Sequence, residues 1–229
     1  MAEPASGGDG QVPGGDDGPR RPELPGAVVV VLAWLAGSVP FSGLAARLLR
    51  GVDLRRHGTG TVSGTGLYRV AGFGPLAVAG SLDVAKGAVG PLLAGRHRPL
   101  VGVAATAAAV AGHNWSVFLG GSGGRGVSPA LGASLVSAPE GTAVLAAGLA
   151  LGRLARQTGL GTFVALVALF PVLARRRGAR GALSALALAG PVLAKRVAGD
   201  RPLRPGRRAA QVAARLVLDR DLAAGPAQA

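Results

Sequence analysis

Long apolar runs alternate with short arginine-rich segments along most of this chain. Residues 27–46 form twenty positions without a charge, residues 99–119 form twenty-one and residues 157–174 form eighteen. A bilayer core about 30 Å thick is crossed by roughly 20 apolar residues, because a helix rises 1.5 Å per residue. Three such runs predict an all-α fold, a polytopic membrane helix bundle.

Two further runs are apolar but less regular. Residues 70–95 contain Asp83 and Lys86, and residues 181–194 form a short last run. Because Asp83 and Lys86 are three positions apart, they share one face of a helix. Ionisable residues inside a span are costly, which favours a functional role for this pair. Mutual neutralisation inside the bundle is the structural alternative.

The run at residues 126–152 is interrupted only by Glu140, and it fits either one crossing or two. Pro139 lacks an amide donor and Gly141 is flexible, so a break is favoured there. A break gives seven transmembrane helices in total, joined by short re-entrant or glycine-rich cytoplasmic loops.

The basic residues favour the count of seven. Cytoplasmic loops carry an excess of Lys and Arg. Seven spans place the loop at residues 47–69, Arg125 and the C-terminal tail on the cytoplasmic face, whereas six spans move most basic residues outside. We therefore expect a multi-pass plasma membrane protein with its N-terminus outside and its C-terminus cytoplasmic. The arginines at residues 175–180 remain on the outer face in this arrangement.

The chain divides into three regions by composition. Residues 1–25 form an acidic Gly/Pro-rich tail that we expect to be disordered. Residues 26–199 form the transmembrane domain and residues 200–229 a basic C-terminal tail, in which residues 207–221 form either an interfacial helix or a solvated segment. The net charge of +14 does not indicate nucleic-acid binding, because one tyrosine and two tryptophans provide few stacking platforms.

Two glycine-rich segments with arginines fall on the same predicted face. Residues 55–70 read RRHGTGTVSGTGLYRV and residues 120–127 read GGSGGRGV. Glycine lets backbone amides approach a ligand, and arginine supplies a planar, permanently charged fork for phosphate oxygens. The pattern predicts a phosphate cradle at the membrane surface. Tight turns between helices are the alternative for each loop.

Three segments together resemble a known family. Residues 37–70 read GSVPFSGLAARLLRGVDLRRHGTGTVSGTGLYRV, residues 82–87 read LDVAKG and residues 112–132 read GHNWSVFLGGSGGRGVSPALG. Their order and spacing are similar to the motif series of the bacterial acyl-phosphate-dependent glycerol-3-phosphate acyltransferases. The resemblance implies a seven-span enzyme that transfers an acyl group from acyl phosphate to glycerol 3-phosphate. The product is lysophosphatidic acid, for phospholipid synthesis in the membrane, and no metal or cofactor is implied.

The resemblance also implies site residues in this chain. The catalytic set is Thr59, Arg69, Lys86, His113 and Arg125. The set that binds substrate phosphate is Gly58, Gly60, Thr65, Gly123, Gly124 and Gly126.

This chain departs from the family in its last span. The family carries His-x-x-Asn-Ile-x-Arg there, and Gly190 and Leu193 stand at the His and Asn places. A lost general base typically costs about 10²–10⁴ in rate. A substrate phosphate with a second pKa near ~6 is an alternative acceptor for the proton. The second hypothesis is therefore a non-catalytic paralogue that binds phospholipid precursors or scaffolds a lipid-synthesis complex.

Overall fold

The computed structural model describes residues 23–57, 60–200, 202–203 and 206–220. Among these residues the α-helices are α1 (Gly26–Ser38), α2 (Phe41–Arg50), α3 (Gly64–Ala71), α4 (Phe73–Ala94), α5 (Pro99–Asn114), α6 (Val127–Ser137), α7 (Pro139–Leu154), α8 (Thr158–Ala198) and α9 (Arg208–Leu218). Short 3-10 turns lie at Leu54–Arg56 and Val117–Leu119. The predicted all-α fold is confirmed. Of the predicted tail at residues 1–25, residues 1–22 lie outside the described residues.

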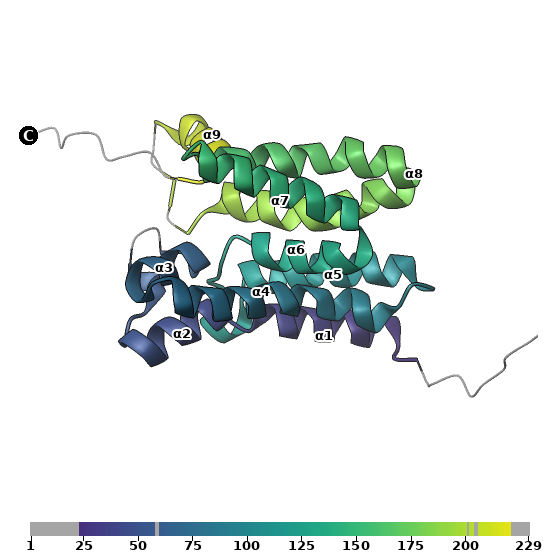
Figure 1. The fold of residues 1–229 in the computed structure, drawn as a ribbon, viewed down its shortest axis with the longest axis horizontal. Coiled ribbons are helices and arrows are strands. Elements are labelled where there is room, and N and C mark those ends of the chain that lie inside the picture. The colour runs from purple at the N-terminus through teal and green to yellow at the C-terminus, as the bar shows by residue number, and fades with distance from the viewer. Residues whose placement is uncertain (1–22, 58–59, 201, 204–205, 221–229) are drawn as a thin grey trace, which may run out of the picture.

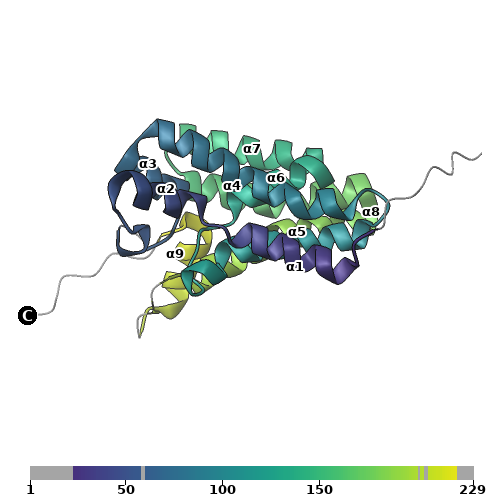
Figure 2. The same ribbon diagram turned by 90° about the horizontal axis from the view of Figure 1, so that it is seen from below.

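The long helices run side by side between two ends of an elongated bundle (Figure 1). Helix α8 reverses direction within its 41 residues, because Gly178 takes a non-helical conformation with φ 59° and ψ −143°. Its two arms, residues 158–177 and 179–198, therefore run in opposite directions (Figure 1). Helices α2, α3 and α9 are short and gather at one end of the bundle (Figures 1 and 2).

Small residues allow the helices to approach closely, as is usual in membrane bundles. A Cβ on Gly87 in α4 would overlap the carbonyl oxygen of Pro129 in α6, and a Cβ on Gly132 would overlap that of Val84. Many large apolar side chains, such as Val78, Leu92 and Phe170, are exposed on the outside of the bundle. An apolar outer surface together with a tightly packed interior is typical of a helix bundle in lipid.

Three stretches among the described residues have the length and hydropathy to cross a membrane. They are Gly26–Arg50, Phe73–Ala94 and Thr158–Ala198. Helices α5, α6 and α7 are shorter, so the count of seven spans stays a prediction. The run at residues 126–152 is divided into two helices at Ala138, directly before Pro139.

The two ends of the bundle carry different groups. At one end Glu23 pairs with His97 and Arg98, and Arg177 pairs with Glu140. The opposite end carries the glycine-rich segments and α9 (Figure 1). The described N-terminal residues and α9 therefore lie at opposite ends. The described parts of the two arginine-containing glycine-rich segments lie at this end, where a single site can form.

Candidate active site

The two glycine-rich segments contact each other through their backbones. Val62 N donates a hydrogen bond to Gly123 O at 3.0 Å. The second segment is also tied to the end of α5, because Gly124 N donates to His113 O at 3.0 Å and Ser116 N donates to Ser122 O at 2.9 Å. The loop at residues 115–126 thus folds back over the helix that precedes it.

A buried charge cluster lies beneath this loop. Lys86 Nζ is 2.7 Å from Asp83 Oδ1, and both side chains are 4% exposed. Lys86 Nζ also donates to Val39 O at 2.6 Å, and Ser42 Oγ donates to Asp83 Oδ2 at 2.7 Å. Buried charges are tolerated when they are paired and hydrogen-bonded. The α1–α2 junction therefore helps to satisfy the pair on α4.

His113 joins this cluster from α5. Its Nδ1 lies 3.9 Å from Asp83 Oδ1, and its side chain is 10% exposed. A Cβ on Gly124 would overlap His113 Nε2, so the loop leaves room for the imidazole only because position 124 is glycine. A small cavity lies between these groups. Its lining residues are Ser38, Pro40, Ser42, Val62, Asp83, Lys86, His113, Ser116, Leu119, Gly123 and Gly124.

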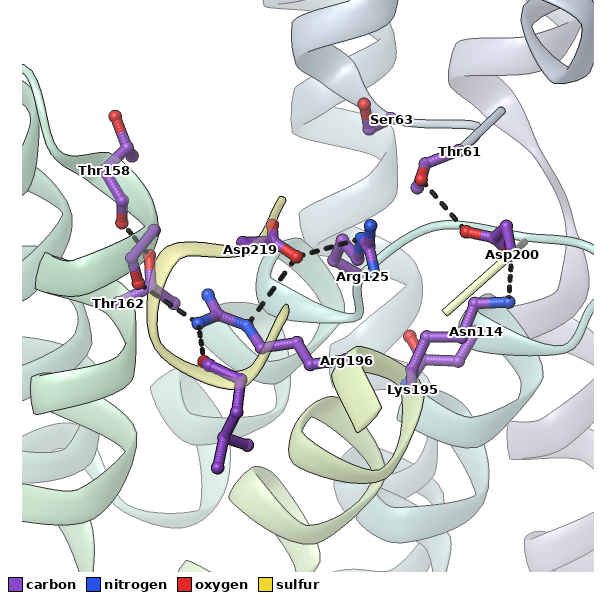
Figure 3. Close-up of polar contacts among 12 residues, drawn as sticks. Thr61, Ser63, Asn114, Arg125, Thr158, Thr162, Lys195, Arg196, Asp200 and Asp219 are labelled. Carbon is purple, nitrogen blue, oxygen red and sulfur yellow. Dashed lines mark hydrogen bonds and ion pairs between the residues drawn. The ribbon is translucent and has the colours of Figure 1, made fainter. Parts of the chain in front are cut away.

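Four of the predicted site residues thus line one cavity, namely Lys86, His113, Gly123 and Gly124. Gly126 is buried next to the loop, where a Cβ would meet the Asn114 side chain. Arg125 is not one of the lining residues described above. Its Nε lies 3.1 Å from Asp219 Oδ1, in a polar cluster beside the cavity (Figure 3).

The predicted residues of the first glycine-rich segment are less concentrated. Arg69 and Thr65 are exposed on α3, and Gly60 is partly buried. Gly58 and Thr59 lie outside the described residues. The nearby acid Asp53 pairs with Arg47 at 2.9 Å and Arg55 at 2.7 Å. The Arg55 hydrogen bond, with help from Arg47, holds the pKa of Asp53 well below its usual range. Both arginines are therefore engaged by a carboxylate.

Sequence reasoning missed a second polar group at the end of α8. Lys195 Nζ is 2.6 Å from Asp200 Oδ1, and Thr61 Oγ1 donates to Asp200 Oδ2 at 3.0 Å (Figure 3). Lys195 also lies 5.7 Å from the centroid of a Trp115 ring. The end of α8 is thereby tied to the first glycine-rich segment at Thr61.

The signal for this group was present in the sequence. Lys195 and Arg196 directly follow the apolar run at residues 181–194. The structure buries them to 2% and 1% exposure. Charged residues near the end of a span are a functional signal when they face the bundle interior, but sequence alone does not give that direction.

The surroundings of Gly190, which stands at the place of the motif histidine in α8, are also polar. Asn114 is fully buried and its Nδ2 donates to Pro191 O at 2.7 Å, directly after Gly190. Asn114 Oδ1 has no hydrogen-bond partner among the described residues. An amide from α5 thus faces the part of α8 where the family motif has its His and Asn. In the described part of the chain, no three His, Cys, Asp or Glu side chains are placed to hold a metal ion.

Comparisons with known proteins identify the same family as the motifs. The sequence model of the family described as glycerol-3-phosphate acyltransferase matches residues 27–197. The chain is 44% identical over 145 residues to the glycerol-3-phosphate acyltransferase of Myxococcus xanthus, covering 61% of this chain and 74% of that protein. It is 40% identical over 168 residues to that of a Synechococcus strain, covering 72% and 84%.

A solved structure shares the fold. It is a crystal structure of PlsY (YgiH), an integral membrane glycerol 3-phosphate acyltransferase, in its glycerol 3-phosphate form. It superposes with a TM-score of 0.70 at 26% identity, covering 87% of this chain and 96% of that chain. The resemblance seen in the motifs is therefore confirmed, together with the membrane-integral helical fold. The motifs, the fold and the family match at residues 27–197 agree that this chain belongs to the glycerol-3-phosphate acyltransferase family.

Proposed function

We propose that this chain transfers an acyl group from acyl phosphate to glycerol 3-phosphate and forms lysophosphatidic acid at the cavity beneath the second glycine-rich loop. Acyl transfer to glycerol 3-phosphate is the activity of the family to which the chain belongs. The observation that carries the proposed site is the folding of this loop over His113 and Lys86. Gly123, Gly124 and Lys86 line this cavity and Arg125 lies beside it, which suits substrates that carry phosphate.

The reaction is a substitution at the acyl carbonyl. The glycerol 3-phosphate hydroxyl oxygen attacks the carbonyl carbon, the bond from that carbon to the phosphate oxygen breaks, and inorganic phosphate leaves. Because acyl phosphate is an activated donor, positioning and charge neutralisation supply much of the acceleration. The hydroxyl proton passes to His113, which Asp83 faces across 3.9 Å, or to a substrate phosphate.

One observation favours the non-catalytic alternative. Lys86 Nζ is already engaged by Asp83 and by Val39 O, and α8 has Gly190 at the place of the motif histidine. Purified protein with acyl phosphate and glycerol 3-phosphate separates the two functions. We expect lysophosphatidic acid and inorganic phosphate to form in equal amounts. Saturable binding of both ligands without product would establish the alternative.

The arginines of the glycine-rich segments should bind substrate phosphate. We assign Arg125 and Arg69 to separate phosphates, and a hydrogen bond to a charged group contributes about 1.5–3 kcal/mol. Arg125→Ala and Arg69→Ala should therefore each raise the dissociation constant of one substrate roughly tenfold to a hundredfold. Arg125→Lys keeps the cation and should cost less. The measurement is equilibrium binding of each substrate to correctly inserted protein.

Arg153→Ala is the matched control for these variants. Arg153 is an exposed arginine at the end of α7, outside both glycine-rich segments. It should leave both affinities unchanged. If Arg69→Ala and Arg125→Ala both keep wild-type affinity for both substrates, the proposed phosphate cradle is contradicted.

We also propose that the end of the bundle with the glycine-rich loops faces the cytoplasm. The chain has no cysteine, so single introduced cysteines report position without background. Arg96 and Arg153 are both exposed, in the α4–α5 connection and at the end of α7. An impermeant thiol reagent added to intact cells should label Arg96→Cys and should reach Arg153→Cys only after lysis. Equal labelling of both in intact cells would contradict this orientation.

A further inference from the structure

Helix α9 lies beyond the part of the chain that the family's sequence model matches, yet its end reaches the second glycine-rich loop. The family match stops at residue 197, and α9 covers Arg208–Leu218. The next residue, Asp219, places its Oδ1 3.1 Å from Arg125 Nε and 4.0 Å from Arg196 Nε. Figure 3 shows this carboxylate between the two guanidinium groups. One acid therefore bridges the loop and the last long helix.

The backbone around Asp219 is held by several contacts. Arg196 Nη1 donates to Leu216 O at 2.8 Å and to Gly159 O at 3.1 Å. A Cβ on Gly159 would overlap the backbone carbonyl of Leu218, so α8 and the end of α9 pack at backbone distance. Arg215 Nη1 also donates to Ala198 O at 3.0 Å. The position of Asp219 is thus set by α8 and not by the carboxylate alone.

The cluster leaves two buried arginine donors without a hydrogen bond among the described residues, Arg196 Nε and Arg125 Nη1. An arginine has five N–H donors in a rigid plane, and Asp219 faces the Nε edge of Arg125. Arg125 Nη1 is buried and has no hydrogen-bond partner among the described residues. Arginine binds phosphate with two donors in a fixed geometry, so the direction of its plane decides whether the ligand is met. A carboxylate on the Nε side fixes that direction.

Charge balance supports the same role. Arg125 and Arg196 are close enough to repel each other, and the Asp219 carboxylate opposes this repulsion. Burial raises the pKa of Asp219, while Arg125 and then Arg196 act in the opposite direction. Without the acid, two poorly solvated cations would face each other. Arg125, which is on a glycine-rich loop, would be the one free to move away.

We propose that Asp219 is a positioning residue, contributed by α9, that orients the Arg125 guanidinium so that its Nη1 edge binds the substrate phosphate. This inference rests on the proposed function, in which Arg125 binds a phosphate. Asp219 acts through Arg125 and does not touch the substrate. Helix α9 is then part of the working enzyme, although it lies outside the segment that the family's sequence model matches.

The test compares Asp219→Asn and Asp219→Glu in the full-length membrane protein. Asp219→Asn keeps the shape and removes the charge, so it should weaken binding of the substrate held by Arg125 about tenfold, the cost of one lost charge-assisted contact. Asp219→Glu should recover part of this loss. Glu140→Gln is the matched control, because Glu140 also pairs with an arginine, 2.7 Å away at the opposite end of the bundle. The melting temperature of each variant is measured alongside.

A double-mutant cycle with Arg125 makes the result specific. If Asp219 acts through Arg125, then Asp219→Asn should add nothing in an Arg125→Ala background. A loss in Arg125→Ala with wild-type or tighter binding in Asp219→Asn would overturn this inference and leave the proposed function standing. Unchanged affinity in Arg125→Ala would contradict both the role of Asp219 and the proposed binding of phosphate by Arg125. A tenfold loss that persists in the Arg125→Ala background would also overturn it, because the effect would then be general.

Discussion

Replacing Lys86 by methionine should destabilise the protein and abolish acyl transfer. Lys86 is 4% exposed, and its ammonium is the cation facing Asp83 at 2.7 Å. Removing one partner of a buried pair leaves an uncompensated charge, which costs about 3–5 kcal/mol. Among the described residues, Asp83 then retains the Ser42 hydroxyl and the more distant His113. The measurements are thermal unfolding in detergent and product formation by the variant that remains folded.

A second substitution separates stability from function. Changing Asp83 to asparagine in the Lys86→Met protein removes the orphaned charge, so most of the lost stability should return. Activity should stay at least about a hundredfold below wild type if Lys86 or Asp83 serves the site, as expected for groups that orient the reacting atoms. Near wild-type turnover in the stable double variant would show that the pair is structural. Helix α4 would then contribute no functional residue of this pair to the site.

The fold was largely predictable because the bilayer imposes a simple length rule. Charge-free runs gave the all-α membrane class, and the proline at position 139 predicted the break that the structure places at Ala138. The reversal inside α8 was also consistent with the arginines at residues 175–180, which interrupt the apolar run. Hydropathy does not give the number of crossings, because α6 has 11 residues and α5 and α7 have 16 each.

The site was predictable in its residue types more than in its arrangement. Spacing alone put Asp83 and Lys86 on one helix face, and the motifs placed His113 and the second glycine-rich loop near them. Local sequence does not reveal that Asp219, 94 positions after Arg125, returns to the loop. It also does not reveal that Asp200 bonds Thr61, because both contacts depend on how α8 and α9 fold back.

The structure gives Gly124 a role that its sequence pattern did not indicate. The loop glycines were expected to bring backbone amides close to a phosphate, but Gly124 N already donates to His113 O at 3.0 Å. The structure instead gives Gly124 a steric role, since a side chain there would overlap His113 Nε2. Glycine in such a loop can serve the neighbouring side chain as much as the ligand.

Replacing Gly124 by alanine should therefore reduce kcat by roughly a hundredfold, because misplacing a catalytic group by about 1 Å has costs of that order. Gly124 is not among the described glycines with positive φ, so its backbone conformation suits alanine. The added methyl group would instead overlap the His113 ring. Gly74→Ala is the matched control, since a Cβ there meets nothing within 4 Å. Steady-state kinetics and unfolding of Gly124→Ala, alone and combined with His113→Ala, measure the effect. If the methyl group acts by displacing the imidazole, Gly124→Ala should be silent once His113 is alanine, whereas an equal loss in both backgrounds would place the cause in the loop itself.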